Sequence, residues 1–209
     1  MMAALKNDKV LLSALILVVI QVFLAIFAPI VAGDPVEQVI INRMKGPPVE
    51  NLLGTDQLGR DVLARILFGY RTSLMTCGVA VLLALIIGGS LGMLAAFYRG
   101  WFDRIVMRIM DVLFAFPIIL LAIGIIAVLG PNILSAAIAI AVVYVPIFAR
   151  LLRGPSLVIC ESEYVQGARA IGASDIRIVF THLLPNLASV ILVQASLLLS
   201  AAILVEASL

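Results

Sequence analysis

The sequence has 209 residues, of which 64% are hydrophobic and only 12% are charged. A soluble domain carries about 25% charged residues, so this composition indicates a polytopic membrane protein and excludes an ordinary soluble domain. The net charge of +2 and the lack of a basic run give no indication of nucleic-acid binding. Cys77 and Cys160 are expected in a span and in a loop, which argues against a disulfide, and no metal-ligand spacing is present.

The first apolar run extends from Val10 to Ala32, after a short polar start with Lys6 and Lys9. It is long enough to cross a bilayer, which takes about 20 residues. A secretory signal peptide is the alternative, but its apolar core is only about 7–15 residues long. We therefore expect a retained span. Residues 33–71 then form a polar loop, and the apolar positions after Gly59 predict an amphipathic helix that leads into the next span.

Four later apolar runs predict four more spans, so the expected fold is an all-α polytopic membrane protein with five transmembrane helices. The runs are 72–97, 111–129, 133–149 and 187–205. In the first of these, small residues recur at every fourth position: Ala84, Gly88, Gly92 and Ala96. Such a stripe lets helix backbones approach closely in lipid, and we interpret it as helix packing. Pro117 and Pro146 fall inside predicted spans, where a packing kink and a pore-lining helix both remain open.

The distribution of basic residues predicts the orientation of these spans. With the N-terminus inside, nine Lys and Arg residues fall in the interior regions 1–9, 98–110 and 150–185, and five fall in the exterior loop 33–71. This bias agrees with the positive-inside rule. It places residues 150–185 in the cytoplasm.

The stretch from Glu163 to Pro185 reads as two short amphipathic helices joined at Gly172, because glycine adopts the left-handed conformation at little cost. Ser174 is expected to cap the second helix, and Pro185 to end it. The predicted apolar faces are Tyr164, Val165, Ala168 and Ile171 in the first helix, and Ile176, Val179, Phe180 and Leu183 in the second. Periodicity alone leaves a lipid surface and a protein partner equally open.

Residue identities in this stretch favour a protein partner. It reads Gln166-Gly167-Ala168, three residues, Gly172, nine residues, then His182-Leu183-Leu184-Pro185. This resembles the "EAA" signature of ABC importer permeases: Glu-Ala-Ala, three residues, Gly, nine residues, Ile, any residue, Leu and Pro. The matching residues are Ala168, Gly172, Leu184 and Pro185, whereas Gln166, Gly167 and His182 depart from the pattern.

Three stretches narrow the resemblance to the second permease subunit of dipeptide and oligopeptide transporters, a branch that includes nickel, glutathione and opine transporters. They are Gly54–Asp61, Asp111–Pro117 and Glu163–Asn186. Members of this branch typically have six spans, so we expect a sixth helix either to be missing from the sequence or to be absent from a natural short form. The resemblance implies two regions, an N-terminal helix with a periplasmic loop (1–70) and an ABC type-1 transmembrane domain (71–209).

The resemblance implies that the two cytoplasmic helices are coupling helices, which dock into a groove of an ATP-binding subunit. The residues expected at that contact are Tyr164, Gln166, Gly167, Ala168, Arg169, Gly172 and Asp175. The chain has no Gly-x-x-x-x-Gly-Lys-Ser/Thr loop, so it is expected to be non-catalytic, with ATP and Mg²⁺ bound by the partner. The other implied partners are a second permease subunit, a periplasmic solute-binding protein and the lipid of a bacterial inner membrane.

Polar residues on one face of the last predicted span are candidates for the pore lining: Asn186, Ser189, Ser196 and Ser200. Hydrogen-bonded helix packing is the alternative for this stripe. Glu206 is a further candidate as an acid in an apolar setting, although an interface position would also explain it. His182, the single histidine, is expected to be structural. An ion-coupled transporter and an intramembrane enzyme are disfavoured because the spans lack the charged residues that either chemistry needs.

Overall fold

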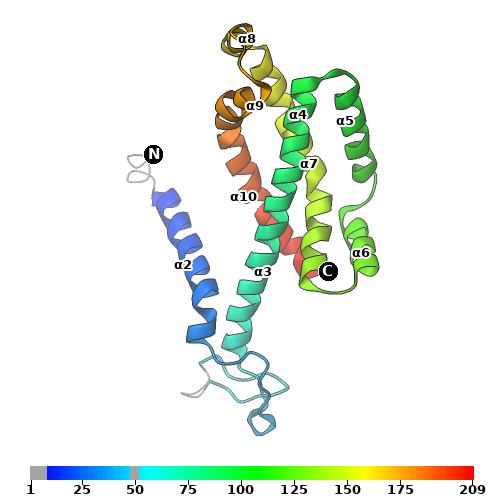
Figure 1. The fold of residues 1–209 in the computed structure, drawn as a ribbon. Coiled ribbons are helices and arrows are strands. Elements are labelled where there is room, and N and C mark those ends of the chain that lie inside the picture. The colour runs from blue at the N-terminus through cyan, green and yellow to red at the C-terminus, as the bar shows by residue number, and fades with distance from the viewer. Residues whose placement is uncertain (1–8, 48–51) are drawn as a thin grey trace. The chain divides into compact units, whose positions relative to one another are not determined.

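The computed structural model describes residues 9–47 and 52–209, and Lys6, which contributed to the charge count, lies outside the described residues. The chain divides into two compact units, Met1–Met75 and Thr76–Leu209. Helix α3 (Val62–Ala84) crosses the boundary between them. The coloured ribbon in Figure 1 gives the order of the elements along the chain.

The first unit begins with the predicted first span. Helix α2 (Lys9–Val31) contains the apolar stretch Leu12–Ile30, which is long enough to cross a membrane. A helix is the expected form of such a stretch because it pairs its backbone groups within the segment, where lipid offers no partner. The prediction of a helical first span is confirmed.

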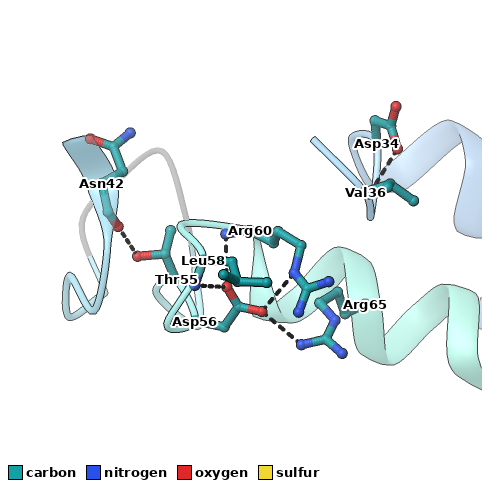
Figure 2. Close-up of polar contacts among 8 residues, drawn as sticks. All are labelled: Asp34, Val36, Asn42, Thr55, Asp56, Leu58, Arg60 and Arg65. Atoms are coloured by element: carbon teal, nitrogen blue, oxygen red, sulfur yellow. Dashed lines mark hydrogen bonds and ion pairs between the residues drawn. The ribbon is translucent and has the colours of Figure 1, made fainter. Parts of the chain in front are cut away.

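The loop after α2 contains a short 3-10 helix, η1 (Ile40–Asn42), and is organised around the Asp56 carboxylate (Figure 2). One carboxylate oxygen accepts from the backbone N–H groups of Leu58 at 2.8 Å and Arg60 at 3.0 Å. The other accepts from the guanidinium groups of Arg60 at 2.8 Å and Arg65 at 2.7 Å. The Arg60 N–H, followed by the Leu58 N–H and the Arg60 guanidinium, holds the pKa of Asp56 well below its usual range. Nothing in the apolar patterning of the sequence pointed to this role for Asp56.

The second predicted span is part of one long apolar helix of 37 residues, Val62–Tyr98. It consists of α3, a π-helical segment η2 (Leu85–Gly89) and α4 (Ser90–Tyr98). The helix that was expected after Gly59 is therefore confirmed, and it runs into the span without a break. A π-helical turn inside an α-helix inserts an extra residue into the turn and is often found at functional positions.

The third span was predicted as one continuous helix, and this prediction is wrong. The chain forms α5 (Gly100–Phe114) and α6 (Ile118–Leu129), which are bent by 92° relative to each other. The break falls at Pro117, which has no N–H to donate and disfavours helical geometry in the preceding residue, Phe116. Residues 100–110, which were predicted to lie in a loop, belong to the amphipathic helix α5 instead.

The predicted fourth span is helical but ends much later than expected. Helix α7 (Ile133–Glu161) has 29 residues and starts at Asn132, whose side chain accepts from the Ser135 N–H at 2.8 Å. It runs through Pro146 and Pro155, so residues 150–161 are not the loop that was predicted. Cys160 accordingly lies in a helix, and both it and Cys77 are buried free thiols.

Close packing of η2 and α4 on α7 explains the stripe of small residues (Figure 1). A Cβ atom on Gly88 would lie 2.2 Å from the carbonyl oxygen of Val145, and one on Gly92 would lie 2.2 Å from that of Ala149. Ala84 and Ala96 are fully buried. The interpretation of the stripe as helix packing is confirmed, and the large buried residues Tyr144 and Phe148 of α7 fill the core beside it.

The second of the two predicted amphipathic helices does not end at Pro185, where the sequence predicted its end. Four elements follow α7: α8 (Glu163–Ala170), α9 (Asp175–Ile178), the π-helical η3 (Val179–Leu183) and α10 (Leu184–Ser208). The last three form one helix of 34 residues, Asp175–Ser208, so Pro185 does not end the second amphipathic helix. Pro185 sits at the start of α10 just after the π-helical turn, where the Leu184 N–H bonds to the Val179 carbonyl. The altered turn accommodates the proline that a regular helix would exclude.

Four described helices are long and apolar enough to cross a membrane, or five if α5 and α6 count as one broken span. This result agrees with the predicted all-α polytopic fold. Within the second unit, Figure 1 shows α8 and α9 at the end of α4 and α7 that lies opposite α6.

Candidate partner-binding surface at helices α8 and α9

The corner between α8 and α9 is fixed by a helix-ending motif at Gly172. The Gly172 N–H donates to the Arg169 carbonyl at 2.9 Å, and the Ala173 N–H donates to the Ala168 carbonyl at 3.0 Å. These two bonds define a Schellman motif, which requires the left-handed conformation at the residue after the helix. Gly172 has a φ of +83°, as the sequence predicted. The Ser174 side chain then accepts from the Arg177 N–H at 3.4 Å, which confirms the predicted cap of α9.

A local core holds both short helices against the rest of the second unit. Val165 of α8, Ile178 of α9 and Leu183 of η3 are fully buried, and they pack with Leu152 of α7 and residues of α4. Each such aliphatic side chain contributes about 1.5–3 kcal/mol when it is fully buried. The corner is therefore a structured surface rather than a loose connection.

The predicted apolar faces were only partly correct. Val165 and Leu183 are buried, but Ile171, Ile176 and Phe180 are exposed to 87%, 73% and 65%. In the second helix, Ile178 takes the buried position instead of Ile176. The helix continues from α9 through the π-helical turn, which shifts the side chains that follow relative to a regular period of 3.6 residues.

The C-terminal end of α4 contacts both short helices. The Arg169 guanidinium lies over the Phe97 ring at 4.4 Å, and the Tyr98 hydroxyl donates to the Asp175 carboxylate at 3.4 Å. Next to them, Arg99 forms an ion pair of 2.9 Å with Glu161 at the end of α7. The sequence predicts only that residues 98–110 lie on the interior side, and it does not connect Tyr98 to this corner. The aromatic pair directly before Arg99 was the available signal.

The other residues predicted for partner contact lie on the exposed side of the corner. Tyr164 is 49% exposed and packs its ring on that of His182, with centroids 5.7 Å apart. This contact is consistent with the structural role expected for the histidine. The Gln166 side chain donates to the Glu161 carbonyl at 2.9 Å. Gly167 is exposed, and a Cβ atom there would meet nothing within 4 Å in the described chain.

The four polar residues of α10 share one exposed face. Asn186 donates to the His182 carbonyl at 2.6 Å, and Ser196 donates to the Val193 carbonyl at 2.7 Å. Ser200 donates to the Ser196 carbonyl at 3.3 Å, while Ser189 is exposed on the same face. These bonds stay within the continuous helix Asp175–Ser208 and do not reach another helix of the described chain. Glu206 is half-buried near the end of α10.

Two ion pairs between α5 and α7 escaped the sequence interpretation. Asp103 accepts two hydrogen bonds of 2.5 Å from the Arg153 guanidinium, and Asp111 pairs with Arg150. The partners are 50 and 39 residues apart in the sequence, so no local spacing could have paired them.

The long apolar helices and the absence of strands in the described residues define the class of protein first: a multi-pass α-helical membrane protein. Residues 88–209 match the family described as "Binding-protein-dependent transport system inner membrane component", and the chain belongs to this family. The match covers η2 to the end of α10 and thus includes the α8–α9 corner. The family resemblance derived from the sequence is confirmed.

Two relatives illustrate the similarity. The chain is 44% identical over 206 residues to the dipeptide transport system permease protein DppC of Alkalihalophilus pseudofirmus, an alignment that covers 98% of the chain and 68% of the relative. It is 47% identical over 165 residues to the glutathione transport system permease protein GsiD of Pectobacterium atrosepticum, which covers 79% of the chain and 55% of the relative. The chain thus spans between about half and two thirds of the length of these relatives.

Proposed function

We propose that this chain is the transmembrane permease subunit of an ATP-driven importer, and that the α8–α9 corner docks on its ATP-binding subunit. The observation that carries the proposal is the exposed apolar side of the corner, where Ile171 and Ile176 are 87% and 73% exposed. Contiguous exposed apolar residues beside polar ones are typical of protein interaction sites. The family match supplies the kind of system in which such a contact is made.

The chemistry of the corner favours a protein groove over a lipid surface. Gly167 lies within α8, where glycine costs about 1 kcal/mol relative to alanine. A Cβ atom at this position would meet nothing within 4 Å in the described chain, so packing within the chain does not explain this glycine. A partner that approaches the backbone closely would explain it. A lipid surface instead favours large apolar residues with a strongly basic polar face.

The transport pathway is proposed to run along the exposed polar face of α10. This face lies opposite the buried side, which contains Leu187, Leu198 and Ala202. An exposed hydroxyl and amide stripe in a span is suited to line a hydrated path between two permease subunits. The second subunit, a solute-binding protein on the outer side and an N-terminus in the cytoplasm all belong to this proposal.

The substrate class is proposed to be di- or oligopeptides or a related small solute. Relatives named for dipeptide and glutathione transport support this class, and both substrates contain peptide bonds. Nickel and opines are the alternatives within the same branch. ATP hydrolysis is assigned to the partner, because the sequence has no phosphate-binding Gly-x-x-x-x-Gly-Lys-Ser/Thr loop. Identification of the ligand that co-purifies with the partner solute-binding protein tests the assignment.

Cysteine cross-linking tests the docking surface directly. Gly167→Cys and Ala168→Cys variants are combined with single cysteines along the groove of the ATP-binding subunit, in a chain in which Cys77 and Cys160 are replaced by serine. We expect disulfide cross-links whose yield changes when ATP is added. A Ser208→Cys variant at the far end of α10 is the control and should give none. Absence of any cross-link from α8, or uptake that persists after ATP depletion, would refute the proposal.

A further inference from the structure

A charged cavity of about 480 Å³ lies beside α5 and α7, away from the α8–α9 corner and from the polar face of α10. It is lined by Asp103, Arg104, Met107, Arg108, Asp111 and Arg153. Three of these six residues are arginines and two are carboxylates. The cavity has no part in the docking or pathway proposals, so its charge calls for a separate explanation.

Both carboxylates of the cavity are already neutralised by α7. Asp103 is held by two hydrogen bonds from Arg153, in the planar geometry that a guanidinium and a carboxylate share. Asp111 pairs with Arg150, whose guanidinium also lies over the Phe114 ring at 4.3 Å. The two acids therefore fix α5 to α7 and leave no negative charge for the remaining arginines.

Arg104 and Arg108 are the surplus cations of the cavity. They lie one helical turn apart on α5, and both are exposed. Arg104 donates to the Gly100 carbonyl at 3.3 Å, and neither arginine has a carboxylate partner in the described part of the chain. Like charges four residues apart on a helix destabilise it slightly. A bound anion would remove that repulsion.

The surface next to these arginines is apolar and carries the only tryptophan of the sequence. Trp101 is 68% exposed and precedes Arg104 by three residues and Arg108 by seven, which places all three on one face of α5. Ile105, Ile109 and Val112 are 50–55% exposed on the adjoining face. Tryptophan and arginine together mark the level of the lipid headgroups in membrane proteins.

We propose that this cavity binds a phosphate group through Arg104 and Arg108, and that the phosphate belongs to the headgroup of an anionic phospholipid. Guanidinium groups match phosphate oxygens in geometry as well as charge, and basic pockets between membrane helices are suited to anionic headgroups. The acyl chains would lie along Ile105 and Ile109. Free phosphate shares the headgroup chemistry but makes no use of the apolar face. The inference rests on the proposed membrane orientation, in which this end of α5 lies at the cytoplasmic surface.

Trp101 provides the test, because it is a single fluorophore beside the proposed site. The full chain is reconstituted in phosphatidylcholine nanodiscs doped with either brominated phosphatidylglycerol or brominated phosphatidylcholine, and quenching of Trp101 is compared. We expect the brominated anionic lipid to be preferred, by about fivefold for each arginine. The Arg104→Gln/Arg108→Gln double variant should lose the preference. Arg43→Gln/Arg177→Gln, which removes the same charge at two exposed positions elsewhere, should keep it.

A second arm distinguishes the two sources of phosphate. Inorganic phosphate is titrated into discs that contain only phosphatidylcholine and into discs doped with brominated phosphatidylglycerol or brominated phosphatidylcholine, and Trp101 emission is followed. A preference for brominated phosphatidylglycerol that survives excess inorganic phosphate supports a lipid site. Saturable binding of inorganic phosphate without a lipid preference would show that the site binds a soluble anion, and it would overturn the assignment to a lipid headgroup. Equal quenching by both lipids together with no phosphate response would overturn the proposal, as would a preference that persists in the double variant. Cross-linking at α8 uses no lipid readout, so a failure here is distinguishable from a failure of the docking proposal.

Discussion

Two pairs of glycines in the second unit have opposite surroundings. Gly88 of η2 and Gly92 of α4 lie against α7, and a Cβ atom at either position would lie 2.2 Å from a backbone carbonyl oxygen. Gly167 and Gly172 lie at the α8–α9 corner, and a Cβ atom at either would meet nothing within 4 Å in the described residues. The first pair is explained by contacts within the chain. In the second pair, only Gly172 has an internal reason, its positive φ.

The two pairs distinguish a packing interface that is filled within the chain from a surface that is exposed. Small residues in membrane helices permit close backbone approach, and α7 occupies that space at Gly88 and Gly92. At the corner the space beside Gly167 is empty, and the neighbouring Ile171 and Ile176 are exposed. This contrast supports the proposed docking of the corner on a partner chain.

The largest effect is expected from Gly92→Leu. The new side chain would collide with the Ala149 carbonyl and force α4 away from α7, in a core that is already closely packed. We expect almost no folded protein in the membrane, measured as the monodisperse fraction after detergent extraction. Gly78→Leu in α3 is the matched control, because nothing lies within 4 Å of a Cβ atom there. If both variants extract normally, the close α4–α7 contact is not required.

The next largest effect is a loss of stability on substitution in α9, where two isoleucines differ in burial. Ile178 is fully buried, so Ile178→Ala should cost about 2–5 kcal/mol of stability. Ile176 is 73% exposed, so Ile176→Ala should change stability by less than about 0.5 kcal/mol. Thermal unfolding of the two variants measures this difference. Binding of the ATP-binding subunit should respond to Ile176→Ala, and unchanged affinity would count against docking at this face.

Gly172→Val should impair coupling without preventing insertion. A residue with a side chain pays about 1–2 kcal/mol in the left-handed conformation, which corresponds to roughly a tenfold shift in the population of the native corner. We expect substrate-stimulated ATPase activity to fall by that order while membrane insertion stays normal. Gly172→Asn is the control, because asparagine tolerates this conformation better. Equal activity of the two variants would show that the corner geometry is not needed.

The smallest effect concerns the pH dependence of the loop around Asp56, which is held by hydrogen bonds within the chain. The pKa of Asp56 is lowered in the folded protein, so the stability it contributes is present above its ordinary pKa of 3.8 and is lost as pH falls through the lowered value. Between about pH 7 and pH 5 we expect the protection of the Leu58 and Arg60 amides from hydrogen exchange, relative to the intrinsic rate at each pH, to stay constant. Asp56→Asn should lower this protection at both amides throughout that range. Protection that falls in the unmodified chain near pH 5 would contradict the lowered pKa.

Three prolines show which features of the helices sequence patterns can predict and which they cannot. Apolar run length predicted the existence of the spans, because the requirement for a long apolar segment is local. It did not predict that α5 and α6 are bent by 92° at the break next to Pro117. Nor did it predict that Pro146 is buried inside an unbroken α7. Pro185 follows a π-helical turn and starts α10. Each outcome depends on packing against other helices, which single-sequence periodicity does not contain.

The candidate site was predictable to the extent that it depends on local chemistry. The positive φ of Gly172 and the Ser174 cap follow from adjacent residues, and both were expected. The contact of Arg169 with Phe97 joins residues 72 positions apart and was not. The choice of Ile178 over Ile176 as the buried residue depends on the π-helical turn, for which no sequence rule was available.

Because the helix from Asp175 to Ser208 is unbroken, α9 and α10 form a single rod that can tilt as one body. Its 34 residues correspond to a length of about 51 Å at 1.5 Å per residue. A tilt of about 5° about one end of such a rod moves the other end by about 4 Å, so a small rocking movement at the α9 end becomes a displacement of more than half a helical turn at the far side of the membrane. The only irregular element along this rod is η3, directly after α9. The change in helical geometry therefore lies next to α9, and α10 is regular along the length that can cross a membrane.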